Sequence, residues 1–339
     1  MEGTIEPLRL GGLELDPPLV LAPLAGYTVP PFRALCFRLG ASLAFTEMVS
    51  AAGLIKSGRR SFPLLERDPG EGPLGVQLFG SDPELVAGAA ALMAPLGFQV
   101  VDLNFACPVP KVTGAGAGAA LMRDPARALA LVAAVKEATP LPVTVKLRLG
   151  WERESVGPLL PRLAEAGAAA LTLHGRTREQ GYRGRADWEA ITRCHRVLGG
   201  RVPLLGSGDL FTPRRCLQVL AEARCDGIQL ARGALNNPWL FRQVGRLLAG
   251  VDPGGVEPGE KRRAAGEILD WLVARKGEKG GVQAFRGFFS RLVKGQAGAR
   301  ELRRRIYRVE DLAGAGVVMD RAFAPPPVGE ATPDRPSPA

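Results

Sequence analysis

The chain has 339 residues, enough for one large core plus a smaller unit, because single hydrophobic cores stop growing near about 250–300 residues. No run of about 18 uncharged apolar residues occurs, and residues 1–15 lack the basic start and apolar stretch of a secretory signal, which argues against membrane insertion and export. The five cysteines form no CxxC pair and no metal-ligand spacing. They fit a cytoplasmic protein with reduced thiols and no structural metal.

Eight strand-like segments alternate with helix-like segments between Leu19 and Leu235. Helix start signals stand at Asp82-Pro83, Asp124-Pro125 and Thr212-Pro213. Eight β/α units over about 220 residues predict an α/β fold, specifically a (β/α)8 TIM barrel, and no GxGxxG turn of a doubly wound sheet follows the first strand. The predicted strands are short apolar runs, as expected for strands buried on both faces: Leu19–Pro23, Leu43–Thr46, Leu74–Phe79, Val100–Asn104, Val143–Leu147, Ala170–His174, Val202–Leu205 and Gly227–Ala231.

A smaller unit follows the predicted barrel. We divide the chain into a barrel domain at 1–248, a linker at 249–260, a basic helical domain at 261–321 and a disordered tail at 322–339. Apolar spacing predicts helices over 261–276 and 282–295, and a third, strongly basic helix over 300–308. We interpret Phe285, Phe288 and Phe289 as the core of this bundle rather than as a surface on which bases stack.

The net charge of +10 is concentrated in the helical domain. Residues 261–308 hold fourteen lysines and arginines against four acidic residues, so the rest of the chain is neutral. We expect this segment to attract a polyanion, most simply a nucleic acid, through phosphate neutralisation.

Functional side chains gather directly after the predicted strands, and the carboxyl ends of barrel strands all meet at one rim. Cys107 taken alone would be interpreted as a buried structural cysteine. However, Asn104 precedes it, Pro108 ends the strand, and a glycine-rich run at 114–118 follows, which indicates a ligand close to the backbone. The same rim collects Gln77, Lys146, Arg148, His174 and Arg176.

Two glycine-containing turns, Ser207–Asp209 and Ala231–Gly233, follow the last two strands, where such barrels hold a phosphate. Gln77 and Lys146 would meet the polar edge of a flat ring, with the lysine stabilising the negative charge that develops on reduction. FMN satisfies both demands. A sugar phosphate satisfies only the first, so a lyase or isomerase on this fold remains an alternative.

The chain also resembles the tRNA-dihydrouridine synthase family, and within it the bacterial B-type branch. The resemblance extends from about Pro7 to Asp311. It is specific, because other FMN barrels share the phosphate turns but lack the Asn-x-x-Cys-Pro sequence at 104–108. The matching segments occur in the family's order and are Ala22–Gly26, Thr46–Met48, Gln77–Gly80, Asp102–Pro108, Val145–Arg148, His174–Thr177 and Gly208–Asp209.

This resemblance implies an FMN-dependent oxidoreductase that reduces specific uridines of tRNA to 5,6-dihydrouridine with NADPH or NADH. Cys107 would protonate C5 of the uracil as a general acid, since a free thiol is ordinarily protonated at neutral pH. The substrate-binding residues that it implies are Asn104, Lys146, Arg148, Arg176 and Arg183. The implied cofactor-binding residues are Pro23, Leu24, Ala25, Gln77, Lys146, His174, Ser207, Gly208, Asp209, Ala231, Arg232 and Gly233. The expected partners are tRNA and NAD(P)H, with no membrane and no obligate protein partner.

One departure from the family pattern bears on the cofactor. Ser207 stands where the family commonly has asparagine, which removes a side-chain amide near the expected FMN site. Two further functions remain alternatives at this point: an RNA-binding protein on an inactive barrel, and a flavin reductase that acts on free pyrimidines. The basic helical segment argues against the second of these, because a free pyrimidine does not require a polycation.

Overall fold

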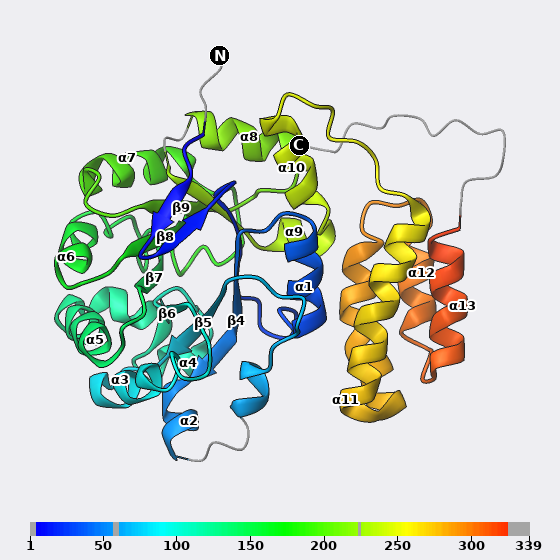
Figure 1. The fold of residues 1–339 in the computed structure, drawn as a ribbon, viewed down its shortest axis with the longest axis horizontal. Helices are drawn as coiled ribbons and strands as arrows, with labels where there is room; N and C mark the ends of the chain where they lie inside the picture. The colour runs from blue at the N-terminus through cyan, green and yellow to red at the C-terminus, as the bar shows by residue number, and fades with distance from the viewer. Residues whose placement is uncertain (1–4, 57–60, 223–224, 325–339) are drawn as a thin grey trace. The chain divides into compact units, whose positions relative to one another are not determined.

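The computed structural model describes residues 5–56, 61–222 and 225–324. The chain divides into two compact units, Met1–Pro253 and Gly254–Ala339 (Figure 1). Among the described residues, no helix has both the length and the apolar character that a membrane crossing requires.

The first unit contains a closed barrel of eight parallel strands, which confirms the predicted fold class. Neighbouring strands pair in chain order, and β10 closes the ring onto β3. Their register places Gln77 beside Asp102, and Asn104 beside Lys146. The strands are β3 (Leu19–Leu21), β4 (Leu43–Ser50), β5 (Leu74–Phe79), β6 (Val100–Asn104), β7 (Val143–Arg148), β8 (Ala170–His174), β9 (Leu204–Ser207) and β10 (Gly227–Leu230).

Helices connect these strands, and the predicted start signals act as caps. The side chain of Asp82 accepts N–H groups at the start of α3, and Asp124 does the same for α5. Short helices follow the strands at the rim, notably α4 after β6 and α9 after β10. The helices of this unit are α1 (Pro30–Arg38), α2 (Ala51–Lys56), η1 (Phe62–Leu65), α3 (Pro83–Ala91), α4 (Pro110–Thr113), η2 (Gly118–Arg123), α5 (Pro125–Ala138), α6 (Leu159–Glu165), α7 (Trp188–Leu198), α8 (Pro213–Glu222), α9 (Arg232–Asn236) and α10 (Leu240–Leu248).

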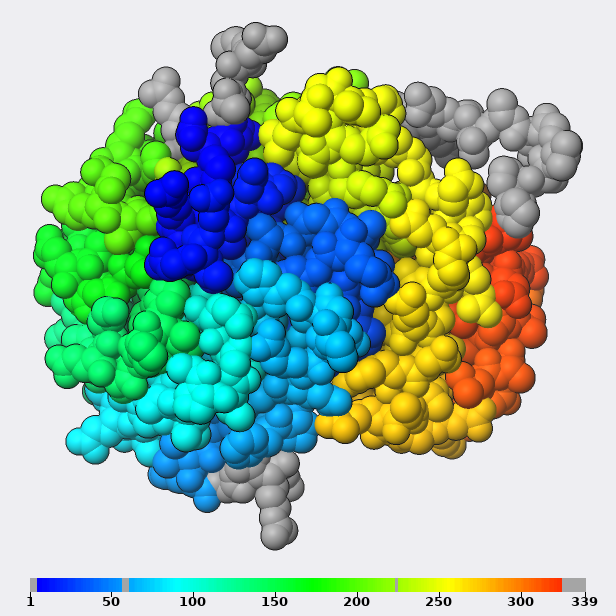
Figure 2. Space-filling model, in the orientation of Figure 1, coloured from blue at the N-terminus to red at the C-terminus, as the bar shows by residue number. Residues whose placement is uncertain are grey.

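A short antiparallel hairpin that the sequence analysis did not predict closes the amino-terminal end of the barrel. It is formed by β1 (Leu8–Leu10) and β2 (Leu13–Leu15). Its leucines pack into one apolar cluster with Leu43 and Val100, the first residues of β4 and β6. Figure 2 shows these N-terminal residues, in dark blue, lying over that face of the barrel. Ligands therefore reach the barrel interior from the opposite, carboxyl end.

Up to residue 324, where the described part of the second unit ends, this unit is a bundle of three helices, α11 (Pro258–Leu292), α12 (Ala299–Ile306) and α13 (Leu312–Ala322). A non-helical backbone at Gly277 (φ 72°) interrupts α11, which explains the separate helices expected over 261–276 and 282–295. Phe285, Phe288 and Phe289 are at most 2% exposed, so they form bundle core as interpreted. Helix α11 begins inside the expected linker, and α13 extends to the first residue of the expected tail. Residues 325–339 of that tail lie outside the described residues.

Candidate active site

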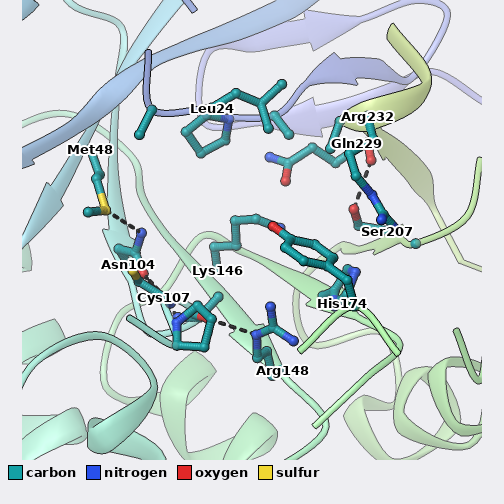
Figure 3. A pocket seen from close by; sticks show the side chains of 18 of the residues that line it. Leu24, Met48, Asn104, Cys107, Lys146, Arg148, His174, Ser207, Gln229 and Arg232 are labelled. Carbon is teal, nitrogen blue, oxygen red and sulfur yellow. Dashed lines mark hydrogen bonds between the residues drawn. The ribbon is translucent and has the colours of Figure 1, made fainter. Parts of the chain in front are cut away.

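A cavity of about 280 Å³ lies at the carboxyl ends of the barrel strands (Figure 3). All twelve residues expected to bind the cofactor line it, as do Cys107, Asn104 and Arg148. Arg176 and Arg183 do not line the cavity. Nine lining residues were not among the predicted site residues: Ala22, Met48, Ala106, Pro108, Val109, Tyr182, Leu210, Phe211 and Gln229.

The turn that presents Cys107 is held by the side chain of Asn104, the last residue of β6. Its Oδ1 accepts the backbone N–H groups of Ala106 (3.1 Å) and Cys107 (2.8 Å), and its Nδ2 donates to Oε1 of Gln77 (2.7 Å). On the other side, Gly118 (φ 60°) passes so close that a Cβ there would lie 2.8 Å from the Cys107 carbonyl oxygen. The amide of Asn104 is thus used to position the thiol, which differs from the uracil contact that the resemblance implies.

The buried carboxylate of Asp102 supports this arrangement through its hydrogen bond to Gln77. Asp102 is 1% exposed, and it accepts hydrogen bonds from Nε2 of Gln77 and Oγ1 of Thr144, both at 2.6 Å. Burial raises the pKa of Asp102 to about 6, against the opposing effect of these hydrogen bonds and of Lys146. Desolvation lowers the pKa of Lys146 to about 8, although Asp102 opposes that shift. The cavity wall therefore carries a lysine that is still mainly cationic at neutral pH.

Arg148 connects two loops at the rim. It is 4% exposed, and its Nε donates to the carbonyl oxygen of Ala106 at 2.7 Å. Its Nη1 donates to the carbonyl oxygens of Thr177 (3.0 Å) and Gly181 (3.1 Å). Arg148 therefore ties the Cys107 turn to the loop after β8, and it lines the cavity as a positioning residue.

Asp209 organises the turn after β9. Its Oδ2 accepts from Nη2 of Arg176 (2.6 Å), and its Oδ1 accepts from Nη2 of Arg232 (3.2 Å). Burial acts to raise the pKa of Asp209, but the hydrogen bonds and charges of its partners outweigh it and lower the pKa. Arg176 also donates to the carbonyl oxygens of Arg183 and Gly184, so it is a buried support of the rim. Arg183 is exposed and bonds the Glu179 carbonyl oxygen, which explains why neither arginine reaches the cavity.

His174 and Tyr182 form one wall of the cavity. Burial, together with the charges of Lys146 and three arginines, lowers the pKa of His174 well below its usual value, so the ring is neutral at pH 7. Its Nδ1 has no hydrogen-bond partner among the described residues. Tyr182 meets the histidine edge-on at 6.4 Å, and the Arg232 guanidinium lies 4.4 Å from the tyrosine ring centroid. Tyr182 occupies an irregular loop, where no periodic pattern could have identified it.

The remaining cysteines are packing groups. Cys36, Cys194, Cys216 and Cys225 are all buried outside the cavity, and burial raises the pKa of each thiol. Among the described residues, no cluster of three or more histidines, cysteines or acids could hold a metal ion. Cys107 is thus the thiol that the fold presents to a ligand.

The turns after β9 and β10 fit a phosphorylated cofactor. Gly208 (φ 132°) adopts a backbone that other residues avoid, and a Cβ on Gly233 would lie 1.8 Å from the carbonyl oxygen of Leu210. Helix α9 starts at Arg232, within the second of these turns, so the N–H groups of its first turn lie at this rim without partners inside the helix. The neutral His174 with its unpaired Nδ1 and the cationic Lys146 complete a site for a flat, polar ring with a phosphate. Fold and site together define a barrel enzyme that takes such a cofactor.

Comparison with known proteins gives the same class. Residues 20–324 match the dihydrouridine synthase (Dus) family. A probable tRNA-dihydrouridine synthase 1 of a Synechocystis species is 36% identical over 324 residues, covering 94% of this chain and 90% of that protein. The tRNA-dihydrouridine synthase B of Pseudomonas aeruginosa is 36% identical over 308 residues, covering 90% and 92% respectively. The chain belongs to the dihydrouridine synthase family, as the resemblance predicted.

A likeness to a solved structure supports the fold. Histamine dehydrogenase from Rhizobium sp. 4-9 superposes with a TM-score of 0.57 at 14% identity, covering 84% of this chain and 51% of that one. This likeness concerns the barrel architecture alone.

Proposed function

We propose that the chain reduces uridines in tRNA to 5,6-dihydrouridine, with FMN as its cofactor and NADPH or NADH as the reductant. The observation that carries the proposal is the position of Cys107, whose backbone N–H donates to Asn104 and whose thiol lies on the wall of a cavity that fits a flavin phosphate. Membership of the dihydrouridine synthase family supports the reaction class.

The residues that would hold FMN fall into three groups. Backbone N–H groups and Arg232 at the turns after β9 and β10 would take the phosphate. Pro23, Leu24 and Ala25 would provide an apolar surface for the ring. Gln77, Lys146 and His174 would meet its polar edge. When bound, FMN supplies hydride that it has taken from the nicotinamide, for delivery to C6 of the uracil.

The chain's own residues would handle the proton and the charge. The Cys107 thiol would donate its proton to C5 of the uracil as general acid. Lys146, on the neighbouring strand, would stabilise negative charge on the uracil carbonyl oxygen and on the cofactor. Asn104 and Arg148 would hold the Cys107 turn in place through their hydrogen bonds to its backbone.

The second unit would bind tRNA. Its helices carry most of the excess positive charge, and α12 displays the exposed Arg303, Arg304 and Arg305. A flavin reductase for free pyrimidines would not require this charge, and an RNA-binding protein on an inactive barrel would not require the positioned thiol. A tRNA substrate and five unpaired cysteines also support a cytoplasmic location.

The test is reconstitution with FMN, NADPH and tRNA that lacks dihydrouridine, with the product counted by mass spectrometry. We expect bound flavin and dihydrouridine formation in the parent chain. Cys107→Ala should keep FMN and still oxidise NADPH without RNA, but oxidation of the reduced flavin by tRNA should slow by about 10²–10⁴. Cys194→Ala, which removes a thiol outside the cavity, should behave as the parent. Near-parental dihydrouridine formation by Cys107→Ala would make Cys107 a packing residue.

A further inference from the structure

Strand β10 carries a buried amide that faces the cavity. Gln229 is 1% exposed and lies between Ile228 and Leu230, which are fully buried. Neither its Nε2 nor its Oε1 has a hydrogen-bond partner among the residues that the structure describes. Figure 3 shows this amide pointing into the cavity, whose wall the residue helps to form.

Other buried or partly buried glutamines of the same barrel are paired. Gln77 donates from Nε2 to Asp102 and accepts at Oε1 from Asn104. Gln99 accepts the backbone N–H of Leu74 and donates to the Gly97 carbonyl oxygen. An unpaired buried amide is costly, whereas a methionine or leucine at position 229 would pack without that cost. The unpaired amide of Gln229 therefore indicates a hydrogen-bond partner supplied by a ligand.

The neighbouring strand β9 contributes a serine, not an amide, at the position beside Gln229. Ser207, the last residue of β9, donates its Oγ to the backbone carbonyl oxygen of Gln229 at 2.9 Å. The serine hydroxyl is thereby engaged with the backbone. In this chain an amide is absent from β9 and present on β10, directly beside it.

We propose that Gln229 is a cofactor-binding residue that hydrogen-bonds the uncharged part of the flavin, its ribityl hydroxyls or the polar atoms of its ring. Gln229 lies two residues before Ala231, inside the barrel relative to the turn that would take the phosphate. A neutral amide both donates and accepts, which suits hydroxyl, carbonyl and ring N–H groups. This inference rests on the proposed function, because it takes FMN as the ligand of the cavity.

Gln229→Met tests the assignment, because methionine is of similar length and makes no comparable hydrogen bond. The full chain is stripped of flavin and titrated with FMN and with riboflavin, which lacks the phosphate, while flavin fluorescence is followed. We expect Kd to rise about tenfold for both ligands, as the loss of a hydrogen bond predicts. The flavin-free variant should melt at the parental temperature or above, while the rise in melting temperature on adding FMN becomes smaller.

Two further variants sharpen the result. Gln218→Met, the same substitution on the exposed face of α8, should leave both Kd values unchanged. Adding Ser207→Asn to Gln229→Met should recover part of the lost affinity, because it places an amide on β9 beside position 229.

The outcomes separate this inference from the proposed function. A parent chain that binds neither ligand contradicts the proposed function itself. If the parent binds flavin and Gln229→Met binds both ligands as tightly, the amide makes no contact and the inference fails. Weakened binding of FMN alone would assign Gln229 to the phosphate and overturn the placement proposed here. A flavin-free variant that melts lower than the parent would make Gln229 a packing residue.

Discussion

Asp102→Ala should destabilise the first unit strongly, because the carboxylate is the acceptor for two buried donors. Nε2 of Gln77 and Oγ1 of Thr144 each lie 2.6 Å from it, and all three residues are at most 4% exposed. A buried donor left unpaired costs about 1–3 kcal/mol, so the two together predict a loss of about 2–6 kcal/mol. At about 2–4 °C per kcal/mol for a unit of this size, the melting temperature should fall by ~4–24 °C.

Differential scanning calorimetry of the flavin-free full chain measures this loss, and Asp102→Asn is the matched control. Asparagine keeps the shape and one acceptor oxygen for Gln77, so it should cost less than half as much as alanine. If the alanine variant melts within about 2 °C of the parent, the donors have found other partners. The description of Asp102 as the support of Gln77 and Asn104 would then be refuted.

The same carboxylate predicts a pH dependence. Burial raises the pKa of Asp102 to about 6 in the folded chain, above the unfolded value of about 3.9, so the folded state binds more protons between these values. The stability contributed by the protonated group is complete below about pH 4 and is lost as the pH rises through 6. The cost of Asp102→Asn should therefore be larger at pH 5 than at pH 7.5. A cost that is constant or grows over this range would contradict the raised pKa.

Two other predictions concern charge. Changing Arg303, Arg304 and Arg305 to glutamine should make tRNA binding less sensitive to salt. The slope of log K against log salt concentration, measured by fluorescence anisotropy, should fall by about 0.7–0.9 for each phosphate that is no longer neutralised. An unchanged slope would mean that α12 does not bind RNA. Arg33→Met should cost about 3–5 kcal/mol in urea unfolding, because it strands the buried Glu71 carboxylate that lies 2.6 Å from the guanidinium. Adding Glu71→Leu should recover most of this loss, and a double variant as unstable as the sum of both would contradict a buried ion pair.

The barrel and its rim could be predicted from sequence because both follow from short-range patterns. Each parallel strand is an apolar run, and residues just after a strand must lie at the carboxyl rim whatever the loops do. This is why Lys146, His174 and the turn at Ser207 were found without a structure. The hairpin at Leu8–Leu15 was missed because its two strands have three residues each, too few for a period to be recognised.

Side-chain direction within a loop could not be predicted, because it depends on contacts far apart in the chain. Arg176 follows β8 as expected, yet it does not line the cavity, and its guanidinium donates to Asp209, 33 residues later, which does. Arg183 lies still further along the same loop and ends at the surface. Gln229 stands out in the sequence as a single polar residue in an apolar strand. The sequence alone, however, does not show whether such an amide has a hydrogen-bond partner in the protein.

The polar groups of this site fall into two sets according to their hydrogen bonds. Asn104 and Gln77 pair with each other and with neighbouring groups, so their main effect is to fix the Cys107 turn before any ligand arrives. His174 and Gln229 keep side-chain atoms unpaired among the described residues, within the same cavity wall. Buried polar groups of folded proteins nearly always have a hydrogen-bond partner, so an unpaired one calls for an explanation. The paired residues therefore fix the shape of the site, and the unpaired atoms of His174 and Gln229 indicate further contacts for its ligand.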